Sequence, residues 1–259
     1  YLDEFLSNYM SIFELKCCLS SLEEYNVDYY LIDGSIYGDL QNPFPKGVET
    51  SAKAKKDLIS ATLNDFEEMV KNPSDKSVYS PKLFNKYFKI YQEHKYPYTL
   101  YLTTIERLVV LKEILKNSRK MIAISKSSSN NDIFHSNMPD IAIFDKYTQK
   151  EGISKVIRKK VSKDINTTFP VFDEFFKDLK FTIFYLRLAD YKNVLKVELP
   201  YEASMAEIEE IASKLKKFST NGYPYLLKKA HNDVVISDKN IKELINIAKV
   251  REKSGREML

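Results

Sequence analysis

Asp33 is the first residue of this sequence whose type and surroundings could do chemistry. It ends an apolar and aromatic run, residues 27–32, and it is followed by Gly34 and Ser35. A carboxylate at the C-terminal end of a buried strand lies at the rim where open α/β sheets hold their ligands. Gly34 would let the backbone turn sharply there and keep the carboxylate accessible. An Asx turn or a helix N-cap is the structural alternative for this tripeptide.

A second carboxylate, Glu14, lies nineteen residues before Asp33, on the flank of an apolar helical face that contains Leu15 and Cys18. If that helix packs beside the strand, the two carboxylates converge on one divalent cation. Hard oxygen ligands suit Mg²⁺ or Mn²⁺, and two such ions can stabilise both the attacking and the leaving oxygen of a phosphodiester. An ordinary surface glutamate is the alternative.

Lys126 directly follows a short apolar run, residues 121–125, and precedes a Ser/Asn loop. A lysine at that place could neutralise a phosphate as a point charge. A solvated loop lysine would look the same in sequence.

The segment 221–233 brings together the remaining candidates. Tyr223 and His231 could position or protonate phosphate and leaving-group oxygens, and Lys228 and Lys229 add charge for a nucleic-acid backbone. A packing turn and a structural histidine are the alternatives for the first two residues.

Hydrophobic periodicity indicates the elements that must position these residues. Apolar residues at helical spacing predict helices over residues 2–25, 51–71, 82–96, 103–116, 204–218 and 238–253. Apolar runs predict strands over residues 27–32, 121–125, 141–144, 181–188 and 194–199, the last two forming a hairpin. Ser204 and Glu207 form a capping box at the start of one helix. We predict a single α/β domain covering residues 1–259.

Composition excludes several classes of protein. The 259 residues are 44% hydrophobic and 29% charged, which suits a globular core and excludes wholesale disorder. No run approaches eighteen apolar residues, so no transmembrane helix is expected, and the acidic start does not fit a secretory signal peptide. Adjacent Cys17 and Cys18 on a helix point to different faces and do not bridge, which indicates a reducing, cytoplasmic setting.

The net charge of +4 is too small to indicate nucleic acid by itself. Basic residues gather in residues 53–56 and 155–163, and we interpret both runs as solvated helix faces.

The order of these motifs resembles the NurA family of archaeal DNA-end-processing nucleases. The shared order is the Glu14 helix, the Asp33-Gly-Ser strand, the Lys126 loop, the hairpin FYLRL and VELP, and the segment that starts at Gly222. The most specific piece is Gly-Tyr-Pro-Tyr at 222–225 with Ala230-His231, and Leu226 departs from the proline usual in the family. Residues 47–100 match least.

The resemblance implies an RNase H-like α/β core with a mixed central sheet flanked by helices. It implies a DNA nuclease, dependent on Mn²⁺ or Mg²⁺, that acts as an exonuclease on DNA ends and as a single-strand endonuclease. Such enzymes resect double-strand breaks for homologous recombination. They are homodimers that act with the hexameric ATPase HerA.

The resemblance also assigns roles to residues. Glu14 and Asp33 would be metal ligands, Tyr223 and His231 active-site residues, and Lys126 a phosphate contact. Arg187, in FYLRL, is a weaker candidate for a DNA contact.

One departure from the family concerns an earlier strand that supplies another carboxylate. We expect that strand upstream of Tyr1. Alternatively Asp33 is that first carboxylate and Glu14 is misassigned. Fallback ligands near the Lys126 strand are Asp132, Asp140 and Asp145.

Two rival functions belong to other classes. A non-catalytic nucleic-acid-binding or helicase-docking subunit would keep the fold without a metal site, and the approach of Glu14 to Asp33 discriminates it. A small-molecule α/β enzyme is disfavoured because the sequence has no Gly-rich phosphate loop, no Gly-x-Ser-x-Gly elbow and no Rossmann fingerprint.

Overall fold

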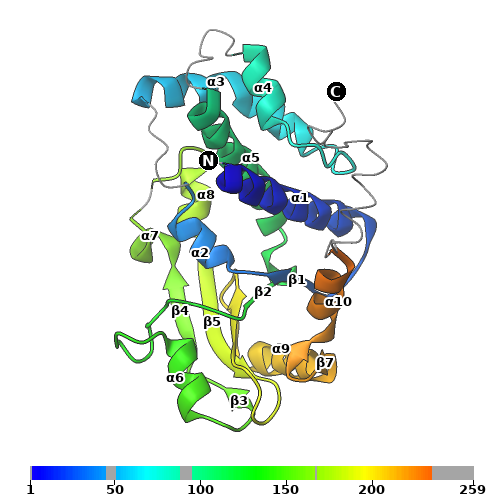
Figure 1. Ribbon diagram of the computed structural model, residues 1–259, viewed down its shortest axis with the longest axis vertical. Coiled ribbons are helices and arrows are strands. Elements are labelled where there is room, and N and C mark those ends of the chain that lie inside the picture. The colour runs from blue at the N-terminus through cyan, green and yellow to red at the C-terminus, as the bar shows by residue number, and fades with distance from the viewer. Residues whose placement is uncertain (1, 45–50, 88–94, 167, 235–259) are drawn as a thin grey trace, which may run out of the picture.

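A mixed, six-stranded sheet forms the centre of the protein, with helices on both of its faces (Figure 1). The computed structural model describes residues 2–44, 51–87, 95–166 and 168–234. The strands are β1 (Tyr30–Asp33), β2 (Met121–Ser125), β3 (Gly152–Ile153), β4 (Ile157–Lys160), β5 (Lys180–Arg187) and β6 (Leu195–Leu199), and β7 (Ser219–Thr220) and β8 (Tyr223–Pro224) form a separate pair. The predicted α/β class with a mixed, helix-flanked sheet is confirmed.

The helices of the described chain fall into two groups. The first runs up to β2 and comprises α1 (Leu2–Glu24), α2 (Ile36–Gln41), α3 (Ala52–Met69), α4 (Ser80–Tyr87), α5 (Lys95–Leu115) and the 3₁₀ turn η2 (Ser118–Lys120). The second comprises α6 (Asp140–Tyr147), α7 (Val161–Asp164), α8 (Asp173–Asp178), α9 (Met205–Lys217) and α10 (Tyr225–Val234). No helix of the described residues is long and apolar enough to cross a membrane.

Strand order places the predicted site at one edge of the sheet. The order is β1-β2-β6-β5-β3, with β4 also paired to β5. β1 and β2 are parallel, with Asp33 opposite Ile124, whereas β2, β6 and β5 pair antiparallel. The carboxyl ends of two parallel strands lie at the same end of the sheet. Asp33 and Lys126 therefore lie next to each other where β1 and β2 end. The hairpin of β5 and β6 was predicted.

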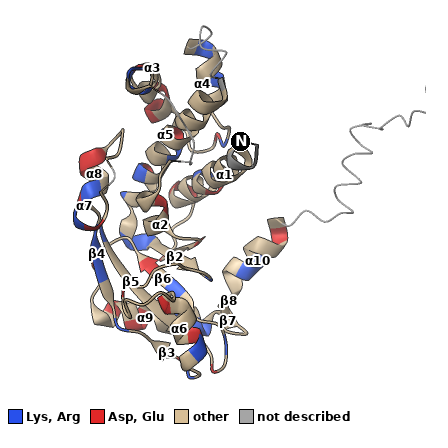
Figure 2. Cartoon of the chain, turned by 60° about the vertical axis from the view of Figure 1, so that its left-hand side comes forward, with Lys and Arg blue, Asp and Glu red and all other residues tan. Residues whose placement is uncertain are grey.

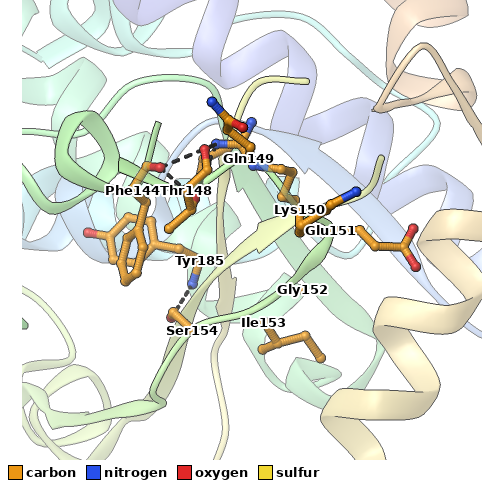
Figure 3. Close-up of a pocket in the computed structure, with 11 residues that line it drawn as sticks. Phe144, Thr148, Gln149, Lys150, Glu151, Gly152, Ile153, Ser154 and Tyr185 are labelled. Carbon is orange, nitrogen blue, oxygen red and sulfur yellow. Dashed lines mark hydrogen bonds between the residues drawn. The ribbon is translucent and has the colours of Figure 1, made fainter. Parts of the chain in front are cut away.

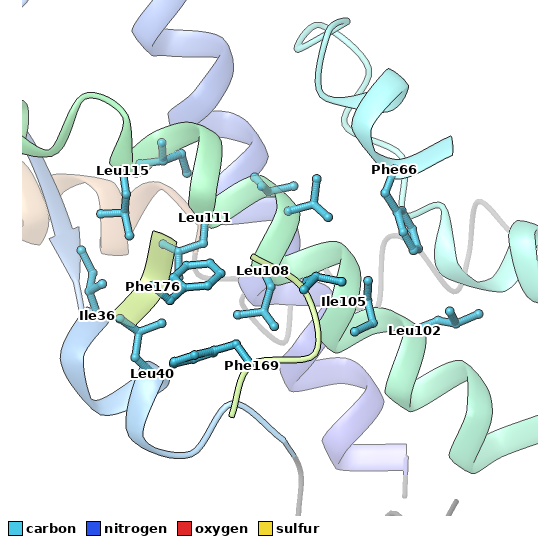
Figure 4. Close-up of a cluster of buried hydrophobic side chains, with 14 of the residues drawn as sticks. Ile36, Leu40, Phe66, Leu102, Ile105, Leu108, Leu111, Leu115, Phe169 and Phe176 are labelled. Carbon is cyan, nitrogen blue, oxygen red and sulfur yellow. The ribbon is translucent and has the colours of Figure 1, made fainter. Parts of the chain in front are cut away.

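Two apolar layers cover the two faces of the sheet. On one face, α1, α5, α3 and α8 enclose a cluster that includes Phe66, Ile105, Leu108 and Phe176 (Figure 4). On the other face, α9 packs Ile208 and its neighbours against β2, β5 and β6. Burial on both faces explains why every residue of β2 and β6 is buried.

Several helices begin where their capping residues predict. α3 starts after Ser51, whose hydroxyl accepts the amide of Ala54. α9 starts after Ser204, and the capping box with Glu207 is formed in both directions. The predicted helix 238–253 lies outside the described residues.

The helical region before β2 differs from the prediction in its boundaries. α5 begins at Lys95 instead of Thr103, because Pro97 lies in the first turn, where proline is tolerated. The helix predicted over 82–96 corresponds to α4 up to Tyr87, and residues 88–94 lie outside the described chain.

The strand predicted over residues 141–144 is wrong, because these residues belong to α6. A four-residue apolar run does not distinguish a strand from a buried helix turn. Here Pro139 precedes the helix, and the buried Asp140 accepts the amides of Ile133 and Phe134 from the preceding loop.

The interpretation of the basic run 155–163 as a helix face is also wrong. Residues 157–160 form β4, which pairs antiparallel with β5 and appears in Figure 2 as a blue strand at the side of the sheet. Its charges are largely neutralised: Lys159 contacts Asp132 at 2.8 Å, and Lys160 contacts Asp178 at 3.3 Å.

Candidate active site

A cavity of about 660 Å³ opens between α1, the end of β1 and α10. Glu14 lines it from α1, Asp33 from β1 and His231 from α10, and these elements lie around β1 in Figure 1. Three of the residues predicted to carry the chemistry are therefore brought to one cavity from opposite ends of the sequence.

Asp33 is the last residue of β1, and its side chain is exposed to the cavity. The next residue is fixed from β2: the Gly34 amide donates to the Ile124 carbonyl at 3.0 Å, and the Ser125 hydroxyl donates to the Gly34 carbonyl at 2.7 Å. Gly34 has a φ of 144°, a backbone conformation that favours glycine. The predicted sharp turn after the carboxylate is therefore present.

Glu14 faces Asp33 across the cavity from α1. The pKa of Glu14 is raised, first by partial burial and then by the negative charges of Asp33 and Asp39. A raised pKa means that a charged Glu14 is disfavoured beside these neighbours, which a bound cation would reverse. The structure thus couples the two predicted metal ligands electrostatically.

Asp39 is a third carboxylate of the same cavity, and the sequence reasoning missed it. It lies on α2, and its pKa is raised by burial although Arg107, 3.9 Å away, acts in the opposite direction. No motif marks Asp39 in the sequence. Its one signal is its position on the short helix that follows the Asp33 turn.

Tyr223 and Lys126 meet next to Asp33. The Lys126 ammonium lies 4.3 Å from the centre of the Tyr223 ring, a cation–π contact. The buried Tyr223 hydroxyl makes no hydrogen bond of standard geometry with the described residues. Burial and then the nearby Asp33 carboxylate raise its pKa to about 12, so the hydroxyl stays protonated and can donate.

A tight turn leads into Tyr223. Gly222 has a φ of 76°, and a Cβ there would collide with the side chain of Lys192 from the β5–β6 turn. A glycine at position 222 is thus required both by its backbone conformation and by this close approach.

α10 follows Tyr223 almost directly, and the sequence reasoning did not predict it as a helix because Gly222 and Pro224 indicate a turn. Buried Leu227 anchors the helix, and His231, one turn later, lines the cavity. Lys228 is exposed, and Lys229 is paired with Asp233 at 2.8 Å on the surface.

Arg187 does not reach this cavity. Its side chain is 5% exposed, and its guanidinium donates to the Phe144 and Thr148 carbonyls at the end of α6. It borders a separate cavity of about 400 Å³, in which Figure 3 shows Phe144, Thr148 and Tyr185. Such a buried guanidinium joins β5 to α6, so we leave Arg187 out of the site.

The fallback ligands also lie elsewhere. Asp132 is paired with Lys159, Asp140 is buried under the loop before α6, and Asp145 lies 3.7 Å from Arg187. None of the three lines the cavity of Glu14 and Asp33.

Glu14 and Asp33 are the two carboxylates predicted to hold a metal ion. Within the described residues, no group of three or more His, Cys, Asp or Glu side chains could hold a metal. Glu14 and Asp33 nevertheless provide hard oxygen donors on one cavity, and Mg²⁺ sites often use one or two carboxylates completed by water and substrate phosphates. The donor set therefore fits Mg²⁺ or Mn²⁺.

Comparison with known families identifies the family of this chain. Residues 1–236 match the family model of the NurA domain. The chain belongs to the NurA family. The resemblance noted from Glu14, Asp33 and the Gly222 segment is confirmed.

Curated NurA relatives align along most of the chain. A NurA protein from Methanocaldococcus jannaschii is 29% identical over 282 residues, covering 100% of this chain and 68% of the relative. The DNA double-strand break repair nuclease NurA of Sulfurisphaera tokodaii is 31% identical over 249 residues, covering 95% of this chain and 66% of that protein. The chain thus spans about two thirds of the length of these relatives.

Solved NurA structures share the fold. The NurA nuclease from Sulfolobus solfataricus superimposes with a TM-score of 0.66 at 24% identity, covering 96% of this chain and 68% of that one. A NurA structure bound to dAMP and manganese gives a TM-score of 0.63 at 15% identity, covering 99% and 78%.

Proposed function

We propose that this NurA-family chain is a DNA nuclease dependent on Mn²⁺ or Mg²⁺, acting on DNA ends and on single strands. The observation that carries the proposal is the cavity that Glu14 and Asp33 both line, in which partial burial and then the charge of Asp33 raise the pKa of Glu14. Support also comes from the relatives named as DNA double-strand break repair nucleases and from the fold neighbour that binds dAMP and manganese.

Glu14 and Asp33 would hold the cation. A bound Mn²⁺ or Mg²⁺ would supply Lewis-acid polarisation of a phosphate oxygen and activation of a water molecule. Without a cation, partial burial and then the negative charges of Asp33 and Asp39 raise the pKa of Glu14. Binding of positive charge therefore has a favourable electrostatic contribution at this place.

Lys126, Tyr223 and His231 would handle the DNA phosphate. The Lys126 ammonium, which contacts the Tyr223 ring, can neutralise a phosphate oxygen beside Asp33. The protonated Tyr223 hydroxyl can donate a hydrogen bond to the same group. His231, exposed on α10, can position the leaving oxygen or give it a proton.

The exposed surface of α10 would extend the DNA contact. Lys228 and Lys229 are exposed, and the surface pair of Lys229 with Asp233 is weak enough to be exchanged for a phosphate.

Family membership supports the proposed biological setting. We assign the chain to processing of double-strand breaks for homologous recombination in the cytoplasm, as a homodimer with a HerA-type hexameric ATPase. We also propose that the core is RNase H-like and that the chain is a single domain. A strand upstream of Tyr1 would supply a further carboxylate.

One observation favours a second function. Within the described residues, no group of three or more His, Cys, Asp or Glu side chains could hold a metal. A subunit that docks DNA on the ATPase without cutting it would need no such group.

Cleavage of end-labelled single-stranded DNA with Mn²⁺, Mg²⁺ or EDTA tests the proposal. Glu14→Gln and Asp33→Asn should each abolish metal-dependent cleavage while DNA binding persists. Glu23→Gln on the same helix and Asp28→Asn before the same strand are matched exposed controls and should cut normally.

A second arm uses a chain extended upstream of Tyr1. Cleavage by the extended chain alone would support the expected additional carboxylate. If neither chain cuts, even with a HerA-type ATPase and ATP, the docking function replaces the nuclease.

A further inference from the structure

A buried ion pair lies directly beneath the turn that carries Asp33. Lys196 and Glu198 are on the same face of β6, and their side chains are 2% and 0% exposed. The Lys196 ammonium contacts one oxygen of Glu198 at 2.7 Å and Asn130 at 3.4 Å. Neither residue lines the Glu14 cavity.

Glu198 binds the segment that follows Asp33. Its carboxylate accepts the Ser35 hydroxyl at 2.5 Å and the Tyr37 amide at 2.9 Å. Ser35 in turn is the N-cap of α2 and accepts the Gly38 amide at 2.8 Å. The Glu198 side chain therefore joins β6 to the start of α2, across β2.

The turn is consequently held from two strands. β2 fixes both backbone groups of Gly34, and β6 fixes Ser35 and Tyr37 through Glu198. Along the chain, Asp33 is preceded by the paired residues of β1 and followed by this anchored turn. Its carboxylate can thus be held beside Glu14 despite their mutual repulsion.

Stability alone does not account for such a pair. Removing two charges from water costs several kcal/mol per ion, and well-packed apolar residues often replace a buried pair without loss. A carboxylate, however, can accept the Ser35 hydroxyl, the Tyr37 amide and the Lys196 ammonium at once, which no apolar side chain can do. Lys196 also offsets the charge that Glu198 would otherwise add near Asp39.

We propose that Glu198, neutralised by Lys196, is a positioning residue that sets the place of Asp33 for metal binding. The inference rests on the proposed nuclease function. It concerns how tightly the site holds its cation rather than the chemical step.

Glu198→Gln is the test. The introduced amide has one acceptor oxygen, so its NH₂ must face either the Lys196 ammonium or the Tyr37 amide, and both are donors. We expect the Mn²⁺ concentration for half-maximal cleavage to rise roughly tenfold or more, as for other residues that orient metal ligands. Excess Mn²⁺ should restore the rate, and DNA affinity in EDTA should not change.

Direct Mn²⁺ binding, followed by electron paramagnetic resonance, separates the two proposals. If the wild-type chain, with any upstream extension, neither binds Mn²⁺ nor cuts DNA, the nuclease function and the positioning role both fail. If wild type binds and cuts and Glu198→Gln shows the same Mn²⁺ dependence, only the positioning role is overturned.

Two further variants distinguish a loss of positioning from a general loss of stability. Ser35→Ala leaves the ion pair intact and removes one link, so it should raise the Mn²⁺ requirement by a smaller factor. Asp140→Asn alters another fully buried carboxylate that accepts two amides, and it should lower the melting temperature without changing the Mn²⁺ requirement. An equal Mn²⁺ effect in Asp140→Asn would contradict the proposal.

Discussion

Two buried lysine–glutamate pairs lie on either side of the candidate site, and they differ in what they join. Lys16 and Glu106 meet at 2.6 Å in the helical layer, where Glu106 also accepts the amides of Tyr79 and Ser80 at the start of α4. Lys196–Glu198 lies in the sheet and holds the start of α2. Each glutamate thus combines an ion pair with the start of a helix.

The helical pair, Lys16–Glu106, connects more distant segments than the sheet pair, Lys196–Glu198. It joins α1 to α5 across ninety positions of sequence, and Lys16 also contacts the Ser77 carbonyl and the Met69 sulfur. The sheet pair lies within one strand and acts on one turn. Similar chemistry thus holds two helices of a layer together in one region and a single turn in another.

The largest expected effect is on folding, at the helical pair. Glu106→Gln leaves Lys16 buried without its counter-ion, so the free energy of unfolding should fall by about 3–5 kcal/mol. Urea denaturation measures it. Glu113→Gln, which breaks an exposed pair with Lys116, should change the free energy by less than about 1 kcal/mol. Equal losses in the two variants would remove the distinction.

The next effect separates charge from positioning at the sheet pair. Lys196→Met combined with Glu198→Gln removes both charges, so it should recover most of the stability lost in Glu198→Gln. It should recover only part of the Mn²⁺ affinity, because the introduced amide still cannot accept both donors from the α2 start. Melting temperature and Mn²⁺ titration of the same samples decide this. Full recovery of both would make Lys196–Glu198 a purely structural pair.

A pH effect is expected at Glu14. Its pKa is raised in the folded chain, so protons compete with Mn²⁺ and the affinity should fall as the pH drops through a window that starts above the ordinary glutamate range. The same shift makes the metal-free folded state bind the proton more tightly than the unfolded chain. Its contribution to stability therefore grows as the pH falls through that window.

Asp39→Asn tests this prediction further, because it removes one cause of the raised pKa of Glu14 without removing a proposed metal ligand. The pKa of Glu14, followed by carboxyl NMR in the metal-free chain, should move downward. No movement would mean that Asp39 is electrostatically separate from the site.

The smallest effect is expected on DNA binding at α10. Lys228→Ala should weaken binding of single-stranded DNA equally for all sequences and reduce the slope of log K against log salt by about 0.7. Lys229→Ala should do less, because Lys229 already shares its charge with Asp233. Fluorescence anisotropy over a KCl series checks both.

Local patterns allowed much of the fold and the turn after Asp33 to be predicted. The Asp33 turn follows from an apolar run that ends in Asp-Gly, and α9 follows from the capping box of Ser204. Glu14 and His231 needed the order of motifs, since a glutamate on a helix or a lone histidine has no distinctive pattern.

The rest depended on tertiary contacts that no local pattern contains. Glu106 and Lys16 look like ordinary polar helix positions until α1 packs on α5. Arg187 looks like a DNA contact until the end of α6 supplies its acceptors. Residues 141–144 look like a strand until Asp140 is seen to bind the preceding loop.

The walls of the cavity come from distant parts of the chain. Glu14 and Asp33 belong to the first thirty-three residues, whereas His231 comes from α10, and Tyr223, next to Asp33, comes from the strand before it. Since a chain leaves the ribosome from its N-terminus, a nascent or prematurely terminated polypeptide carries both carboxylates long before it has the tyrosine and the histidine. The order of synthesis thus delays completion of the proposed nuclease site until nearly the whole described fold exists to contain it.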